Sequence, residues 1–332
     1  MTPSPSRRRA LSAALSFGAA PMFTSLGAFA ETWPARTVRI VEPGAPGGGN
    51  DTTLRLFAPY LERELGRSFV VENRPGAGGR LGVEAAVRSA GDGYTLLMGN
   101  AGSNGINGAI YRNLPYDLET DLTPISLLVT GPNALVVNPR IFPVDDVAGL
   151  VAAIKAKPPG FYNYASGGIG SSAHLSAELF KQMTGVQLEH IPYKGASAVG
   201  QAIITGDAPL FIGNLINVMP FVGRGEVKLL AVTSLTRWPD LPKVPTLDES
   251  GLRGFETIAW NGLFGPKGLP GAVAERLVPA LQRIGRLPEV VSRVKSIGGQ
   301  IVCSAPDVLA ARVRSDLAKW RDLARRANIR AE

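Results

Sequence analysis

The feature that most constrains this chain is a repeated alternation of short apolar strands with amphipathic helices. The first hundred residues predict strand, helix, strand, helix and strand at 37–41, 54–65, 68–72, 81–89 and 94–98. Gly66 supplies a stop signal for the first helix, and Pro59 predicts a kink within it. Strands that alternate with helices in this way predict a parallel sheet covered by helices.

The alternation begins again after residue 130. Helices are predicted at 144–155 and 172–184, and strands at 134–137, 161–166, 186–190, 209–212, 227–234 and 257–264. The last helix opens at Ser304-Ala-Pro-Asp307, a spacing typical of a capping box. Two such arrays, with no low-complexity linker between them, predict an α/β protein of two lobes that the chain crosses between more than once. We expect one lobe to comprise 31–130 plus 250–332 and the other 131–249.

The N-terminus has the pattern of a cleavable export signal. Three arginines at 7–9 precede an apolar and small-residue run at 11–29, and Ala28-Phe-Ala30 fits a signal peptidase site. Polar residues interrupt the run, so it lacks the ~20 mainly apolar residues that a membrane-spanning helix needs. We therefore expect residues 1–30 to be a signal peptide cut after Ala30, and the mature chain to be periplasmic. The paired arginines leave both the general secretory and the twin-arginine routes open.

Composition narrows the class of protein further. Without residues 1–30 the chain has 302 residues, enough for two domains with separate cores, and a net charge of +5. Its basic side chains are scattered, which argues against nucleic acid as a partner. Cys303 is the only cysteine, so no intrachain disulfide can form. With only two histidines as well, the sequence predicts no metal site.

Three loops that follow predicted strands are candidates for ligand binding. The first loop, 43–51, has three consecutive glycines before a helix, and Asp51 is expected to be the N-cap or a first-turn residue of that helix. The second loop, 99–104, and the third loop, 166–172, are rich in glycine, serine and asparagine. Ligands of such sheets bind beyond the carboxyl ends of the strands, and the N–H groups at a helix start favour an anion. A fourth glycine-rich stretch, 73–79, predicts a tight strand-to-helix turn.

The third loop also supports an enzymatic alternative. Gly168-Ile-Gly-Ser-Ser-Ala173 fits the pattern G-x-G-x-x-A between a strand and a helix, and Glu189 follows at the distance of a ribose-binding acid. This alternative is an exported NAD(P)-dependent oxidoreductase. Other catalytic patterns are weak, and His174 is predicted to be hydrogen-bonded within a helix or loop rather than to act as a base. Tyr193-Lys194 could place a phenol and a cation at a strand end.

A series of short motifs runs in order through nearly the whole mature chain. They are Ala45-Pro-Gly-Gly-Gly-Asn-Asp51, Val70-Val-Glu-Asn-Arg-Pro-Gly-Ala-Gly-Gly79, Asp92-Gly-Tyr-Thr-Leu-Leu97, Leu114-Pro-Tyr-Asp117, Tyr164-Ala-Ser166, Gly170-Ser-Ser-Ala-His-Leu175, His190-Ile-Pro-Tyr-Lys-Gly195, Leu229-Leu-Ala-Val-Thr-Ser234, Val244-Pro-Thr246 and Trp260-Asn-Gly-Leu-Phe-Gly-Pro266. In these motifs the chain resembles the extracytoplasmic solute receptors of the tripartite tricarboxylate transporter family, often called Bug receptors.

The resemblance implies a two-domain periplasmic-binding-protein fold of type II-like architecture, which closes like a clamshell on a ligand in the cleft between its lobes. It implies a carboxylate ligand held by loop N–H groups, small hydroxyls and ordered water. The ligand-binding residues that it implies are Ala45, Gly47, Gly48, Asp51, Ser103, Ser166, Gly170, Ser171, Ser172, Tyr193 and Asn214.

Two departures from the family pattern bear on the ligand. Gly44 stands where the family usually has an aromatic residue, which removes a pocket wall. Gly213 stands before Asn214 where the family usually has an aspartate. Loss of that carboxylate argues against amine recognition, and we expect Gly213→Asp to weaken binding of a purely anionic ligand.

The sequence therefore predicts a non-enzymatic receptor, most simply a monomer, that needs no cofactor. It would capture a small carboxylate and deliver it to membrane transporter subunits. A receptor that presents its closed form to a membrane sensor protein would use the same cleft, so this alternative stays open beside the oxidoreductase. The sequence does not name the carboxylate.

Overall fold

The computed structural model describes residues 32–194, 196–326 and 329–330. The predicted export signal at 1–30 lies outside these residues. From Trp33 onward the chain forms one compact unit, to which every helix and strand described below belongs. Among the described residues, no helix combines the length and apolar character that crossing a membrane requires.

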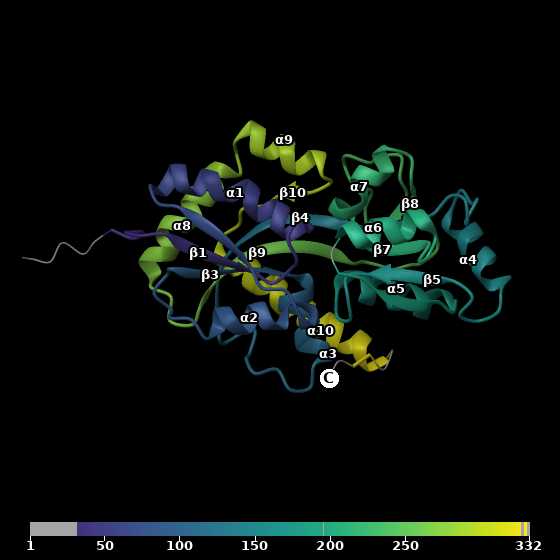
Figure 1. Ribbon diagram of the computed structural model, residues 1–332, viewed down its shortest axis with the longest axis horizontal. Helices are drawn as coiled ribbons and strands as arrows, with labels where there is room; N and C mark the ends of the chain where they lie inside the picture. Colours follow the sequence, from purple (N-terminus) through teal and green to yellow (C-terminus); the bar gives the residue numbers. More distant parts are fainter. Residues whose placement is uncertain (1–31, 195, 327–328, 331–332) are drawn as a thin grey trace, which may run out of the picture. The chain divides into compact units, whose positions relative to one another are not determined.

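The first sheet is built from the two ends of the chain (Figure 1). Its strands run in the order β2-β1-β3-β9-β4, and β10 pairs with β4. β1 is parallel to β2 and β3, whereas β9 is antiparallel to both of its neighbours. The strands are β1 Val38–Glu42, β2 Phe69–Asn73, β3 Thr95–Asn100, β4 Leu122–Val137, β9 Ile258–Pro266 and β10 Gln300–Ile301.

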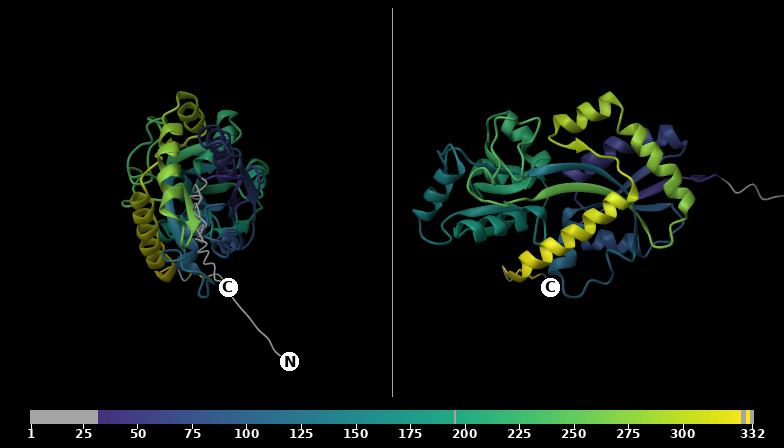
Figure 2. Two further views of the ribbon diagram at one scale, coloured as in Figure 1. Left: turned by 90° about the vertical axis from the view of Figure 1, so that its left-hand side faces the viewer. Right: turned by 180° about the vertical axis from the view of Figure 1, so that it is seen from behind.

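Alternating residues of β1 explain why helices cover both faces of this sheet. Val38 and Ile40 pack into one cluster with α1, α8 and α9, and Val41 packs into another with α2 and α10. Figures 1 and 2 show these two groups of helices on opposite sides of the strands. The helices are α1 Gly49–Leu65, α2 Arg80–Val87, α8 Gly271–Ile284, α9 Pro288–Ser296 and α10 Pro306–Arg326. Two shorter segments follow β3, a π-helical turn at Gly102–Ile106 and α3 Asn107–Ile110.

The second sheet is built from the middle of the chain. Its order is β4-β7-β5-β6, with β8 also paired to β4, and β5 is parallel to β6 and β7. Helices α4 and α5 pack on one face, and α6 and α7 on the other. The elements are β5 Asn163–Ser166, β6 Glu189–Pro192, β7 Leu210–Asn214, β8 Lys228–Val232, α4 Val147–Lys155, α5 Ser172–Thr184, α6 Ala196–Thr205 and α7 Leu215–Gly223.

Strand β4 is the largest difference from the sequence prediction. We expected a strand at 134–137, but β4 begins at Leu122. Its first part pairs with β9, and its last residues pair with β7 and β8, so one strand belongs to both sheets. Pro124 and Pro132 hid the first part, because proline is rare inside strands. Register shifts between Pro124 and Ser126 accommodate that part of the strand.

Smaller differences concern helix starts and short helices. α4 begins at Val147 rather than at residue 144, because Asp146 is its N-cap and accepts a hydrogen bond from the Gly149 N–H at 2.7 Å. α1 stops at its C-cap Gly66, as predicted, and Pro59 lies inside the helix. α5 spans the predicted 172–184 and ends at Gly185, which has a positive φ. α6 and α7 were not predicted.

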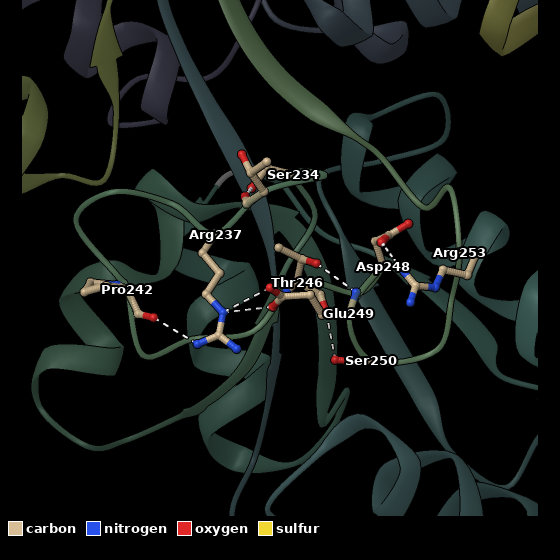
Figure 3. A network of polar contacts seen from close by, with 9 residues as sticks. Ser234, Arg237, Pro242, Thr246, Asp248, Glu249, Ser250 and Arg253 are labelled. Carbon is tan, nitrogen blue, oxygen red and sulfur yellow. Dashed lines mark hydrogen bonds and ion pairs between the residues drawn. The ribbon is translucent and has the colours of Figure 1, made fainter.

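The chain passes between the two sheets along β4 and returns through the segment that leads from β8 to β9. Ion pairs and hydrogen bonds stabilise this returning segment (Figure 3). Thr246 and Glu249 form a capping box, and Arg237 pairs with the Glu249 carboxylate at 2.9 Å. We propose that the lobe boundaries lie at these two crossings, giving lobes 31–130 plus 250–332 and 131–249; we call them the first and second lobes.

Asn133 joins the two crossings. Its side-chain nitrogen lies 2.9–3.0 Å from the hydroxyls of Ser172, Ser176 and Thr257, and its two N–H groups can donate to two of them at a time. Its backbone carbonyl accepts from the N–H and the hydroxyl of Thr233, each at 3.0 Å. Asn133, Thr233 and Thr257 are completely buried. Buried hydrogen bonds of this kind specify geometry, because breaking one leaves a polar group without water or a partner.

We predict that Asn133→Ala lowers the free energy of unfolding by about 1–3 kcal/mol, because it removes the donor shared by the buried hydroxyls of Ser176 and Thr257 and the half-buried hydroxyl of Ser172. Urea unfolding followed by circular dichroism measures this change. The matched control is Asn163→Ala, which removes an exposed side-chain bond to the Asp207 carbonyl and should cost less than ~0.5 kcal/mol. Equal losses in the two variants would contradict a special role for Asn133.

Candidate functional site

A cleft of about 1210 Å³ opens where the two lobes meet. From the first lobe it is lined by the ends of β1 and β3, the start of α1 and the turn between β2 and α2. From the second lobe it is lined by the third loop and by the ends of β6 and β7. The cleft thus lies beyond the carboxyl ends of the parallel strands, as sheets of this kind place their ligands.

Two helix N-termini, one from each lobe, open onto this cleft. Asn50 and Asp51 lie in the first turn of α1, and Ser172 and Ala173 in the first turn of α5; all four line the cleft. Among the hydrogen bonds of the described residues, the backbone N–H groups of these four have no acceptor. Free N–H groups and the positive end of the helix dipole favour an anion.

Asp51 secures the first of these N-termini. Its carboxylate accepts hydrogen bonds from the Gly47 N–H, the Arg55 guanidinium and the Asn73 amide at 2.9–3.0 Å. Burial by itself would raise the pKa of this carboxyl, but the bonds from Arg55, Gly47 and Asn73 outweigh it and lower the pKa. Asp51 is therefore an anion whose oxygens are already used, and it shapes the first loop.

The cleft brings together seven of the residues that the sequence implicated. Those that line it are Ala45, Gly48, Asp51, Ser171, Ser172, Tyr193 and Asn214. Ser171 is the N-cap of α5 and accepts from the His174 N–H at 3.3 Å, and Asn214 caps α7 through the Ile216 N–H at 3.1 Å. Their side chains therefore form the helix starts as well as the wall of the cleft.

Two further residues implicated by the sequence, Gly47 and Ser103, do not line the cleft. The Gly47 N–H is taken by Asp51, as described above. The Ser103 hydroxyl is buried and donates to the Asn104 side-chain oxygen at 2.6 Å. The structure thus assigns these two residues to the support of the first and second loops.

Ser166 and Gly170 of the third loop also lie outside the lining. The buried Ser166 hydroxyl lies 2.6 Å from His190 Nε2 and accepts from the Gly168 N–H at 3.0 Å. The Gly170 N–H donates to His174 Nδ1 at 3.3 Å. Both residues hold the loop in place, and His174 is the hydrogen-bonding partner that the sequence predicted.

Several lining residues were missed by the sequence analysis. The turn at 75–79 was expected to be only a turn, yet it forms a wall of the cleft. The rule applied to the other loops would have found it, because it too follows the carboxyl end of a parallel strand. Phe211, Trp260 and Arg330 line the cleft with no local signal in the sequence. Asn217 of α7 reaches the first lobe and accepts from the Gly49 N–H at 3.1 Å.

Glu42 is the most unusual of the missed residues. It is the last residue of β1, it lines the cleft, and it is completely buried. One carboxyl oxygen accepts from the Gly44 N–H at 2.7 Å, and the other has no hydrogen-bond partner in the part of the chain that the structure describes. Burial raises the pKa of Glu42 to about 8 against the opposing effect of the Gly44 hydrogen bond. A charged residue at the end of an apolar strand was a signal available in the sequence.

The geometry argues against the dinucleotide alternative. A ribose-binding acid belongs at the carboxyl end of its strand, beside the glycine-rich loop. Glu189 instead pairs with Asn163 at the beginning of β5, three residues from Ser166, where the third loop starts. Three strand residues span about 10 Å. Across residues 32–194, 196–326 and 329–330 there is also no group of three His, Cys, Asp or Glu side chains placed to hold a metal.

The structure also shows a steric constraint at Gly213. A Cβ atom at this position would overlap the ring of Phe211 and would lie 2.8 Å from the Ala173 Cβ. Gly213→Asp would therefore displace Phe211, which lines the cleft, whatever charge it introduced. Weaker anion binding by Gly213→Asp stays a prediction, but the clash with Phe211 would contribute to it as well as the charge.

Two stacked histidines lie behind the third loop. The rings of His174 and His190 are 4.3 Å apart, and Tyr164 stacks on the other side of His190 at 4.9 Å. Burial, assisted by the neighbouring His174, lowers the pKa of His190 to about 4. The pKa of His174 is lowered by burial as well. Both rings are therefore neutral at pH 7.

We predict that acid destabilises the protein partly through His190. In the unfolded chain this group titrates near pH ~6.5, so between that pH and its folded pKa of about 4 the unfolded state binds the extra proton. Its contribution to stability is present above pH 6.5 and is lost as the pH falls towards 4. Melting temperatures at pH 7 and pH 5 should differ less in His190→Gln than in the unchanged protein; an equal difference would contradict this assignment.

The fold and the cleft together define a class: two-lobed α/β receptors that bind a small molecule between their lobes. The chain matches the family model described as tripartite tricarboxylate transporter family receptor over residues 53–329, and it belongs to that family. It is 34% identical to the UPF0065 protein in the tcbD-tcbE intergenic region of Pseudomonas sp. (strain P51), with 88% of this chain and 87% of that protein covered. It is 32% identical to protein BugT of Bordetella pertussis, covering 89% and 90%.

Solved structures support the same assignment. The chain is similar to R. palustris Rpa4515 with adipate, with a TM-score of 0.85, 34% identity and coverage of 90% of this chain and 99% of that one. It is similar to MatC from Rhodopseudomonas palustris with bound malate, with a TM-score of 0.83, 32% identity and coverage of 88% and 99%. The predicted family and the two-lobed clamshell fold are thereby confirmed.

Proposed function

We propose that this protein is a periplasmic receptor that captures a small organic carboxylate and delivers it to a membrane transporter of the tripartite tricarboxylate type. One observation carries the proposal. Two helix N-termini from different lobes present unused N–H groups to the same cleft. A carboxylate held by both would join the lobes.

Other groups of the cleft suit an acid with a second polar end. Lys194 and Tyr193 project from the end of β6, and Arg330 lines the same cavity. The volume of about 1210 Å³ leaves room for a molecule of several carbon atoms together with water. Adipate and malate, named for two of the similar structures, are both dicarboxylates, which supports the same class of ligand here.

The mechanism needs no chemical step. In the proposed cycle the ligand enters the open cleft, the lobes close about the two crossings near Asn133, and docking to the transporter releases the ligand. The protein would act as a monomer, without a cofactor and without breaking a bond. The residues that we propose to hold the ligand are the cleft-lining members of the set implied by the sequence, Ala45, Gly48, Asp51, Ser171, Ser172, Tyr193 and Asn214.

A thermal-shift screen tests this proposal directly. The mature protein is melted with organic acids (adipate and malate among them), amino acids and dinucleotides. A carboxylate present at ~100 times its dissociation constant should stabilise the fold by about 2.7 kcal/mol, which raises the melting temperature measurably. A shift with NAD(P) alone would overturn the receptor proposal in favour of the oxidoreductase.

A paired substitution at Ser172 tests the role of the α5 N-terminus. Ser172 is the first residue of α5, where proline is tolerated, and Ser171 has the extended conformation that precedes proline (φ −70, ψ 156). Ser172→Pro removes the N–H and the hydroxyl, whereas Ser172→Ala removes only the hydroxyl. We expect the proline variant to bind the carboxylate about tenfold more weakly than the alanine variant, since a hydrogen bond to a charged group contributes ~1.5–3 kcal/mol.

Calorimetric titration of both variants measures the difference. Both lose the hydrogen bond that Ser172 accepts from Asn133, so this loss cancels in the comparison. Equal affinities of the two variants would show that the Ser172 N–H does not contact the ligand.

A further inference from the structure

Glu42 has the features expected of a ligand-binding group. Its side chain lies on the face of β1 that packs against α1, at the end of the strand where the cleft begins. It is completely buried, and its second carboxyl oxygen has no hydrogen-bond partner among the described residues. A buried polar atom without a partner is uncommon in a folded protein and calls for an explanation.

The surroundings of Glu42 keep it neutral. Burial raises its pKa to about 8, and the charge of Asp51 adds to this effect. The Gly44 N–H, the nearby Asn50 amide and Arg55 oppose it, and Arg55 is itself paired with Asp51 at 2.9 Å. At the same level of the neighbouring strands, the register places the uncharged residues Asn73 on β2, Met98 on β3 and Leu263 on β9. Among the described residues, no cation forms an ion pair with Glu42, because Arg55, which acts on it, is bonded to Asp51.

A neutral carboxyl group has one acceptor oxygen and one O–H donor. The oxygen bonded to the Gly44 N–H must be an acceptor, so the proton belongs on the other oxygen, the one without a partner. We propose that this O–H of Glu42 donates a hydrogen bond to the bound carboxylate, so that the receptor takes its anion only while Glu42 is protonated. The proposal rests on the carboxylate-receptor function and names a specificity-determining residue within it.

The proposal distinguishes ligand classes. A protonated Glu42 favours a ligand group that accepts hydrogen bonds, such as a carboxylate. An ionised Glu42 would repel that anion and would attract an ammonium group instead. Loss of the proton therefore weakens binding of a purely anionic acid, and binding of such an acid raises the proton affinity of Glu42 in return.

The pH dependence of binding has a defined sign. Below the pKa of about 8 the group is protonated and the affinity is constant. Above it each pH unit lowers the protonated fraction tenfold, so the affinity for adipate should be about tenfold weaker at pH 9 than at pH 6.5. At pH 9 binding should also take up close to one proton, and at pH 6.5 none.

Titration calorimetry with adipate and with malate tests the proposal, at pH 6.5 and pH 9 and in two buffers of different ionisation enthalpy. Glu42→Gln keeps the shape and an N–H donor but cannot titrate, so its affinity should vary less than twofold between the two pH values. Glu119→Gln is the matched control, because this exposed glutamate lies outside the cleft and should leave the tenfold change intact. Proton uptake by the unchanged protein tests the proposal even where Glu42→Gln does not fold.

Three outcomes of this titration would contradict the proposal. Binding that is independent of pH, without proton uptake, would make Glu42 a buried structural acid and overturn the proposal while leaving the receptor function intact. Affinity that rises above pH 8 and loses this rise in Glu42→Gln would mean that an ionised Glu42 binds a cation, which also overturns it. No binding of any organic acid at either pH would overturn the receptor function and this proposal together.

Discussion

The buried hydrogen bonds of Asn133 are the constraint on which the rest of the structure depends. They join the strand that leaves the first lobe to the segment that returns to it, and they also include Ser172 at the start of α5. The crossing between the lobes and an N-terminus in the cleft are thus tied by one side chain. Since α5 begins where Asn133 holds it, movement about the crossing moves the N–H groups that face the other lobe.

This connection explains why the chain needs rigid elements on both sides of the cleft. β4 is shared by both sheets, so each lobe is completed by part of the same strand. The returning segment has its own ion pairs, such as Arg237 with Glu249. The two crossings are ordered, and the glycine-rich loops need only supply small residues and N–H groups at the strand ends.

The sequence predicted the alternation of strands and helices because each element carries a local signal. The bounds of helix α5 were predicted correctly, because the capping roles of Ser171 and Gly185 depend only on neighbouring residues. The first part of β4 escaped prediction because its prolines argue against a strand, whereas its stability comes from pairing with β9, more than a hundred residues away. Helices α6 and α7 were missed although each carries a local signal: Gly206, with a positive φ, ends α6, and Asn214 caps the start of α7.

The candidate site was predictable to the extent that its residues lie in loops after strands. That rule located the first and third loops, but it could not separate residues that face the cleft from those that support it. Ser166 is a residue type suited to ligand binding, yet its hydroxyl is hydrogen-bonded to His190, which is distant in sequence. Glu42 falls outside that rule because it is the last residue of the strand rather than a residue of the loop that follows. Asn217 and Arg330 reach the cleft only through the tertiary fold.

The overlap between Gly213 and the ring of Phe211 couples these two positions in any change of ligand preference. An acidic residue at 213 needs space that the Phe211 ring fills, and a smaller residue at 211 would provide that space while enlarging the cleft. An evolutionary or engineered path from anions towards amines would therefore pass through an intermediate with a roomier, less selective pocket. The order of the two substitutions is set by packing rather than by charge.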